Sequence, residues 1–156
     1  MNTSSSIEQR LVHLGITLPP VMPPAGNYLS CVLDGDLLHV GGHGPVNGTS
    51  IITGKVGRDL TIAEAQHAAR VTGLSLLASM QAELGTLDRV VRIVKVFGMV
   101  NTAPGFNQTP AVINGCSDLL VEVFGDAGRH TRSAVGMAEL PFDIAVEIEL
   151  IARVKA

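Results

Sequence analysis

The chain has 156 residues, a formal net charge of −3, no Trp and a single Tyr, and its eleven Lys and Arg residues are scattered along the sequence. Nucleic-acid-binding domains usually carry a basic patch and aromatic platforms for stacking bases, so this balance disfavours nucleic-acid binding. Hydrophobic residues make up 46% of the chain and charged residues 16%. Such an apolar balance in one small domain suggests that some apolar surface is buried against other subunits.

Neither a signal peptide nor an apolar run of about 20 residues is evident, so no membrane partner is expected. Cys31 and Cys116 lack metal-like spacing and have no evident base nearby in sequence. They are therefore interpreted as core thiols, and the expected location is a reduced, cytoplasmic one.

The first 25 residues are predicted to form an N-terminal arm with a short helix. Ser5 and Glu8 fit a capping box that opens this helix, and two Pro-Pro pairs between residues 19 and 24 then prevent regular structure. Strands over residues 28–33 and 37–40 follow, because Asp34-Gly35-Asp36 between apolar runs is a good hairpin signal. Residues 41–58 are predicted to be a loop.

Two long helices are predicted in the middle of the chain. Thr61 and Glu64 form a capping box, and the helical pattern that follows stops at Gly85. A β-branched run over residues 89–100 indicates a strand. Thr109 as N-cap and Pro110 at the first helical position then begin a second helix, which ends at Gly125.

The last quarter of the chain, residues 131–154, reads as two further strands joined at Leu140-Pro141. The second strand alternates, with Val146, Ile148, Leu150 and Ala152 on one side and Glu147 and Glu149 on the other. Residues 26–156 are thus expected to form one α+β domain. Two helices cover only one face of its sheet, so a second copy of the chain is the expected cover of the other face.

The glycine-rich stretch at residues 41–45 lacks the Lys-Ser/Thr of a P-loop and the spacing of a dinucleotide-binding loop. Its interpretation is a turn or a pocket edge where a ligand approaches the backbone. His39 and His43 have no third ligand nearby, so no metal site is expected. No serine or cysteine resembles an activated nucleophile.

Arg132 and the glutamates at positions 147 and 149 are expected to lie on neighbouring strands, and they leave two interpretations open. They form either a structural ion pair or the floor of an anion-binding pocket, in which arginine's planar fork binds a carboxylate and a glutamate orients a water. Periodicity does not decide between the two glutamates.

These residues resemble a known family. The stretch Arg132-Ser133-Ala134-Val135, Leu140-Pro141 and Val146-Glu147-Ile148-Glu149 resembles the C-terminal signature of the RidA/YjgF family of reactive-intermediate deaminases. Asn27-Tyr28, the strand at 91–97 and Asn114 fall in matching order, so the likeness covers about residues 26–156. The fold that the resemblance implies is a chorismate-mutase-like α+β domain with a mixed sheet and two main helices on one face. Its homotrimer encloses a sheet-lined barrel with sites between subunits.

The activity implied is hydrolysis of reactive enamines and imines, such as 2-aminoacrylate, 2-iminopropanoate and 2-iminobutanoate, to 2-oxo acids and ammonia, with no cofactor. By the resemblance, Arg132 clamps the substrate carboxylate with help from the Ala134 N–H, and Glu147 positions the attacking water. The resemblance also places four residues in the substrate pocket: Tyr28, Gly42, His43 and Asn114.

The chain departs from the family pattern at the pocket edge. Gly41 stands where the better-known members have serine, His43 where they have glutamine, and Ala134 where they often have cysteine. The substrate is therefore left open. An alternative is a non-catalytic trimeric module that binds small carboxylates or acts as a chaperone. Endoribonuclease activity, assigned to some members, is disfavoured by the acidic balance.

Overall fold

The computed structural model describes residues 6–155, and its centre is a five-stranded sheet in the order β1-β2-β7-β5-β6. Only β5 and β6 pair in parallel, which makes the sheet mixed. The main elements run in the order α1 (Ile7–His13), β1 (Cys31–Asp34), β2 (Leu37–His43), β3 (Val46–Asn47), β4 (Ser50–Ile51), α2 (Ile62–Leu84), β5 (Val90–Asn101), α3 (Thr109–Phe124), β6 (Thr131–Met137) and β7 (Val146–Val154).

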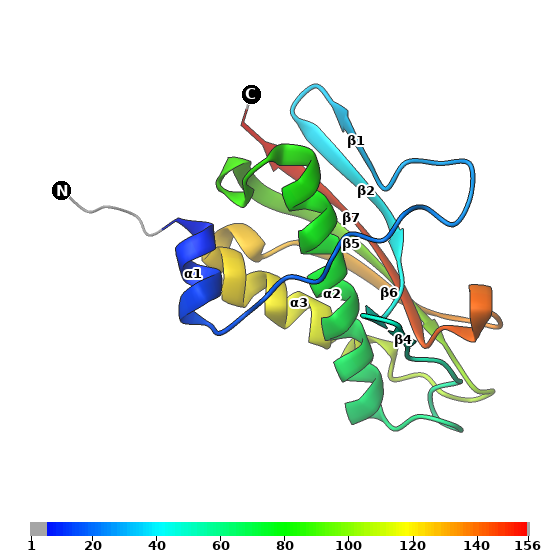
Figure 1. Ribbon diagram of the computed structural model, residues 1–156. Helices are drawn as coiled ribbons and strands as arrows, with labels where there is room; N and C mark the ends of the chain where they lie inside the picture. Colours follow the sequence, from blue (N-terminus) through cyan, green and yellow to red (C-terminus); the bar gives the residue numbers. More distant parts are fainter. Residues whose placement is uncertain (1–5, 156) are drawn as a thin grey trace.

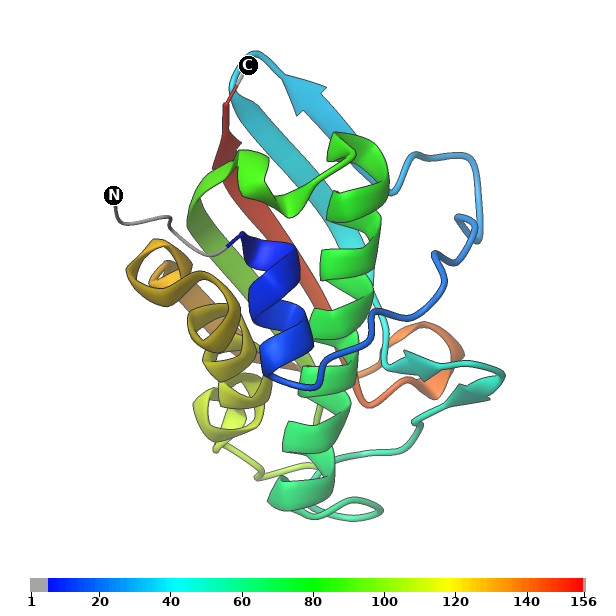
Figure 2. The same cartoon turned by 60° about the vertical axis from the view of Figure 1, so that its left-hand side comes forward.

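α2 and α3 pack on one face of this sheet, α1 lies against α3 on the same side, and no α-helix of residues 6–155 covers the other face (Figures 1 and 2). The buried core lies between the sheet and this helix layer and includes Val96, Leu120 and Ile148. The predicted α+β class, with a mixed sheet and two main helices on one face, is confirmed. None of the helices in residues 6–155 is long and apolar enough to cross a membrane.

The N-terminal arm contains the expected short helix, but its capping box is formed by Ser6 and Gln9. The predicted pair was Ser5 with Glu8, of which Ser5 lies outside the described residues. Glu8 has another role, because its carboxylate accepts hydrogen bonds from the Thr86 hydroxyl at 2.6 Å and from the Leu87 N–H at 3.1 Å. The arm is thereby fastened to the chain just after α2.

The two long helices begin and end where capping predicts, with one correction. Thr61 and Glu64 form the capping box of α2, and Gly85 and Gly125 cap the C-terminal ends of α2 and α3. Thr109 is not the N-cap of α3; it is the first helical residue, and its hydroxyl donates to the Ala134 carbonyl at 2.9 Å. The hydroxyl therefore joins the helix to β6.

Glycines allow the two long helices to pack closely. A Cβ at Gly115 would lie 2.0 Å from the Gln66 carbonyl oxygen, and one at Gly73 would lie 2.8 Å from Leu119 Cδ2. Such contacts leave no room for a side chain, so α2 and α3 approach each other along a line of small residues. This packing places the start of α3 beside β6.

The last two strands are not neighbours, which corrects the expectation that their charged residues face each other across one strand pair. β7 lies between β2 and β5, and β6 lies beyond β5 at the edge of the sheet. The predicted alternation along β7 is confirmed, since Val146 and Ile148 are buried and Glu149 is exposed. The Leu140-Pro141 turn therefore carries the chain past β5 and does not close a hairpin.

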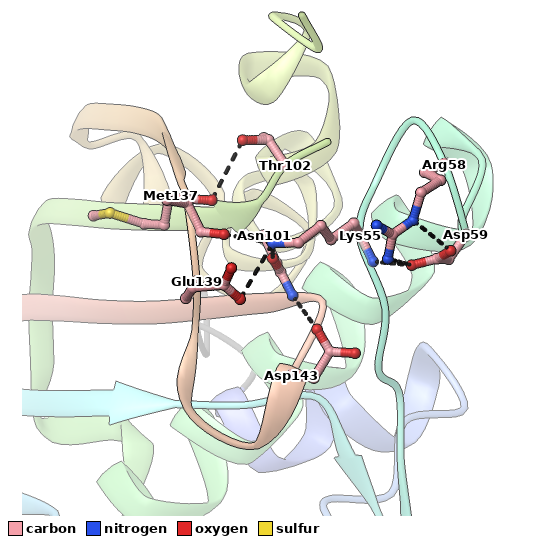
Figure 3. A network of polar contacts seen from close by, with 9 residues as sticks. Lys55, Arg58, Asp59, Asn101, Thr102, Met137, Glu139 and Asp143 are labelled. Carbon is pink, nitrogen blue, oxygen red and sulfur yellow. Dashed lines mark hydrogen bonds and ion pairs between the residues drawn. The ribbon is translucent and has the colours of Figure 1, made fainter. Parts of the chain in front are cut away.

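A polar network pins the turn before β7 (Figure 3). Lys55, from the loop before α2, donates its ammonium to Asn101 Oδ1 at 2.8 Å and to the Ala138 carbonyl, and lies 3.4 Å from Glu139. Asn101 is fully buried, and its side-chain amide donates to Asp143 at 2.8 Å. The network joins the ends of β5 and β6 to the turn that leads into β7.

We expect Lys55→Met to destabilise the fold by about 2–3 kcal/mol, because it leaves a buried amide oxygen and a carbonyl without their charged donor. The measurement is the urea unfolding midpoint at unchanged m-value. The matched control is Arg58→Met, which removes a solvent-exposed ion pair with Asp59 on the same loop and should leave the midpoint almost unchanged. Equal losses in the two variants would contradict the role given to Lys55.

Candidate functional site

Glu147 projects from β7 on the open face of the sheet, where its register partner on β5 is Met99. Its side chain is half-buried, and its carboxylate accepts no hydrogen bond from the described residues 6–155. A Cβ added at Gly42 would lie 2.1 Å from Glu147 Oε1. Gly42 therefore leaves the space in which this carboxylate lies, and a side chain at position 42 would displace the end of the Glu147 side chain.

A β-bulge in β2 produces this arrangement. Val40 is opposite Leu150 and His43 is opposite Ile148, so β2 takes three steps where β7 takes two. The additional residue falls at Gly41 and Gly42, and it reverses the side on which the following side chain projects. With strict alternation His43 would lie on the open face; with the bulge it lies on the helix side.

The ring of His43 is held between β2 and α2. Its Nδ1 lies 2.8 Å from the Gly41 carbonyl oxygen, and its Nε2 lies 2.8 Å from Ser79 Oγ. Burial lowers the pKa of His43, which favours the neutral ring. The structure thus places His43 behind Gly42 as a support of the bulge, whereas the sequence pattern placed it at the pocket edge.

The electrostatic environment of Glu147 favours its protonated form more than water does. Burial raises the pKa of the Glu147 carboxyl, and the like charge of Glu149, two residues along the same side of β7, raises it further. Glu149 itself is exposed. The two glutamates that periodicity left equivalent are therefore distinguished by burial.

Arg132 is held at the other end of the candidate site, on the edge strand β6. Its guanidinium donates through Nη1 to Asn114 Oδ1 at 2.8 Å and to Ser117 Oγ at 3.1 Å, and through Nη2 to the Pro110 carbonyl at 3.4 Å. All three partners belong to α3. The predicted pair of Arg132 and Asn114 is thus brought together, and Ser117 is added to it.

Sequence reasoning missed Ser117, although a signal for it exists. Ser117 lies three residues after Asn114, so the two side chains share one face of α3. A polar pair at this spacing on an otherwise apolar helix face indicates a polar partner on the strand that the helix packs against.

The backbone of Ala134 faces the same edge of the sheet as the candidate clamp. Its carbonyl accepts from the Thr109 hydroxyl and therefore points away from β5. In an extended strand the N–H and C=O of one residue point to the same side, so the Ala134 N–H is also directed outward. This orientation is compatible with the predicted contribution of that N–H to anion binding.

Tyr28 lies on an exposed stretch of the N-terminal arm. Its side chain is 52% exposed, and its hydroxyl accepts a hydrogen bond from the Ala25 N–H at 3.1 Å. Residues 20–29 are all exposed. Within residues 6–155, no hydrogen bond joins Tyr28 to Arg132 or Glu147.

A single chain also keeps Arg132 and Glu147 apart. Arg132 is in register with the buried Val96 and contacts the helix layer, whereas Glu147 is in register with Met99 on the open face. Strand β5 lies between them, which adds two strand spacings of about 4.8 Å each. The two groups are therefore on opposite faces of one sheet, too far apart for one small molecule.

The remaining candidate groups are possible metal ligands and the two cysteines. No group of three His, Cys, Asp or Glu side chains in residues 6–155 is arranged to hold a metal ion. Both cysteines are free and buried; burial raises the pKa of Cys31 to about 11 and that of Cys116 to about 12. The interpretation of both as core thiols is confirmed by their burial.

The mixed five-stranded sheet with its helix layer on one side defines a single α+β domain. Residues 8–154 match the model of the family described as "YjgF/chorismate_mutase-like, putative endoribonuclease". The chain belongs to this family, and the resemblance noted in the sequence is confirmed.

Three relatives show where the chain stands within the family. Protein TCP17 of Trypanosoma cruzi is 47% identical over 150 residues, which cover 95% of this chain and 94% of that protein. The solved structure of Atu1372 from Agrobacterium tumefaciens, a protein of unknown function, is 43% identical with a TM-score of 0.89 and covers 96% of this chain and 92% of that one. A "putative endoribonuclease" from Shewanella oneidensis is 31% identical with a TM-score of 0.92 and covers 96% and 99%.

We expect the carboxyl of Glu147 to titrate above the ordinary range of glutamate, because burial penalises its charged form. Glu149→Gln should lower the pKa of Glu147 by removing the like charge, yet leave it above the ordinary value because burial is the larger cause. The measurement is a carboxyl-detected ¹³C NMR titration, with Glu147→Gln used to assign the resonance. A Glu147 pKa at or below that of an exposed glutamate would contradict the burial described above.

Proposed function

We propose that the protein hydrolyses small enamine and imine acids, of the 2-aminoacrylate, 2-iminopropanoate and 2-iminobutanoate type, to 2-oxo acids and ammonia. The observation that carries the proposal is the arginine on the edge strand, which the protein orients with part of its fork left for a ligand. Of the five N–H groups of a guanidinium, three donate to acceptors on α3. The Nε–H and one Nη2–H have no partner among residues 6–155, and Nε and Nη2 form the side of the fork that binds a carboxylate in two parallel hydrogen bonds.

The proposed reaction needs orientation more than strong chemistry. Arg132 holds the substrate carboxylate, and the Ala134 N–H adds a donor. The imine carbon is already electrophilic, so a water fixed beside it supplies much of the rate gain. Glu147 accepts a proton from this water as its oxygen bonds to the imine carbon, and it returns the proton to the nitrogen. The product of this addition is a carbinolamine. A second proton then moves from its hydroxyl to the nitrogen through the same carboxylate, the C–N bond breaks as the C=O bond forms, ammonia leaves, and the 2-oxo acid remains.

The raised pKa of Glu147 supports this role. A carboxylate with a raised pKa is a stronger base than an exposed glutamate, and a pKa closer to neutrality suits a group that must take and then return a proton. Gly42 leaves room for its carboxylate, and His43 supports the bulge that contains Gly42. Asn114 orients the arginine, and Tyr28 lines the pocket in the assembled protein.

The proposed active form is a homotrimer in which Arg132 of one copy faces Glu147 of the next. Three features support an assembly with shared sites: the opposite-face placement of the two residues, the sheet face without helices, and the exposed arm that carries Tyr28. Exposed apolar side chains on the strands, among them Val32 and Val135, are suited to burial between copies.

We expect Arg132→Ala to lower kcat/KM for 2-iminobutanoate by about 10- to 100-fold, the value of lost hydrogen bonds to a charged group. The measurement is ammonia release from the imine generated in situ. The control is Arg129→Ala, three residues earlier, whose side chain is 72% exposed and which should retain full activity. No acceleration by the wild type would refute the deaminase; binding of 2-oxobutanoate without turnover would instead favour a carboxylate-binding module. RNA cleavage lost in Arg132→Ala would favour an endoribonuclease.

We expect Glu147→Gln to lower kcat by about 100-fold or more, since the amide neither accepts nor returns the proton. Glu149→Gln is the matched control on the same side of the same strand, and it should change kcat by less than about fivefold. The measurement is the kcat of each variant from steady-state kinetics at saturating imine. Similar losses in both variants would mean that the strand, and not the carboxylate of Glu147, sets the rate.

A further inference from the structure

Two side chains outside the proposed reaction lie directly behind the guanidinium of Arg132. Ser117, on α3, has its hydroxyl oxygen 3.1 Å from Arg132 Nη1 and 2.9 Å from Nε2 of His130. His130 precedes β6 and lies with its Nδ1 2.6 Å from the Gly128 carbonyl oxygen. The three side chains form a continuous chain of hydrogen bonds from the backbone of Gly128 to the arginine.

The chemistry of the end groups fixes the direction of these hydrogen bonds. The Gly128 carbonyl only accepts, so Nδ1 of His130 carries the proton. In the neutral ring Nε2 is then an acceptor and takes the hydrogen of the Ser117 hydroxyl. The Ser117 oxygen is thereby left to accept from Arg132, which only donates. Every donor in the chain has its acceptor, and the direction requires a neutral His130.

The environment of His130 keeps the ring neutral near pH 7. Burial lowers the pKa of His130, and the positive charge of Arg132 lowers it further, against the opposing effect of the Gly128 carbonyl. Arg132 is the charged group that acts on the ring. The neighbouring Arg129 is exposed and paired with Asp126 at 3.4 Å.

We propose that Ser117 and His130 are positioning residues, which orient the guanidinium of Arg132 so that its free side binds the carboxylate of a small 2-oxo or 2-imino acid. This proposal rests on the proposed function for the identity of the ligand. A guanidinium on a long, flexible side chain loses rotational freedom when it binds. The Ser117–His130 pair, together with Asn114, fixes the guanidinium beforehand, so that less freedom is lost on binding and affinity rises.

A first experiment needs no ligand. Nitrogen-detected NMR of His130 should show a neutral ring with the proton on Nδ1 and a pKa below the ordinary histidine value. Arg132→Met should raise this pKa, because it removes the neighbouring positive charge, while Arg129→Met should leave it unchanged. A proton on Nε2, or a His130 pKa that ignores Arg132, would overturn the proposed chain of hydrogen bonds.

A second experiment tests the effect on binding. Ser117→Ala should weaken 2-oxobutanoate binding about tenfold by calorimetry, the effect of one hydrogen bond to a charged group, whereas Ser117→Thr, which keeps the hydroxyl, should stay within about twofold of the wild type. His130→Gln keeps an acceptor for Ser117 and should lose less affinity than His130→Phe. Ser75→Ala, a helix serine that donates to the Val71 carbonyl in α2, is the control for serine removal and should bind as the wild type does.

The results separate the two proposals. With 2-iminobutanoate, Ser117→Ala should raise KM while kcat changes little, a division that general loss of folded protein does not produce. If Ser117→Ala binds 2-oxobutanoate as tightly as the wild type does, the positioning role is overturned, while the proposed deaminase activity is not affected. A wild type that binds no 2-oxobutanoate would refute the proposed function, and the NMR result would still decide whether Ser117 and His130 hold Arg132.

Discussion

Strand β5 separates the two charged groups on which the proposed reaction depends. Arg132 lies on β6 and faces the helices, and Glu147 lies on β7 and faces the open side of the sheet. A sheet is one backbone thick, so no side-chain rotation brings these groups around one small acid. The arrangement makes chemical sense if each copy of the chain supplies half of a site, the arginine at its sheet edge and the glutamate on its open face.

Each half is built by a local device that the rest of the fold holds in place. On the glutamate side, the bulge at Gly41 and Gly42 opens space for the carboxylate, and the half-buried ring of His43 fixes the bulge. On the arginine side, the start of α3 supplies the acceptors, and the glycines between α2 and α3 set where that helix lies. Both halves thus depend on close backbone approach, which is where glycine is needed.

Much of this fold follows from local sequence signals, and the errors have specific causes. The start of α2 was predicted correctly because Thr61 and Glu64 form a capping box, in which each side chain accepts a hydrogen bond from the backbone N–H of the other residue within one turn. The prediction that β6 and β7 are neighbours was wrong. The two strands follow each other in the sequence, but β5, which comes earlier in the chain, lies between them in the sheet. The sequence gives no local signal for the side on which His43 projects, because the bulge adds one residue and a one-residue shift reverses every later side chain. Ser117 was missed because its partners are distant in sequence.

The most direct test of a site shared between copies is complementation by mixed assembly. Arg132→Ala and Glu147→Gln chains, each of low activity alone, are unfolded, mixed in equal amounts and refolded together, and ammonia release from 2-iminobutanoate is measured. If Arg132 of one copy acts with Glu147 of another, random mixing restores about a quarter of the wild-type activity, because one pairing in four has both residues. Activity no higher than that of the two variants assembled separately would contradict the account.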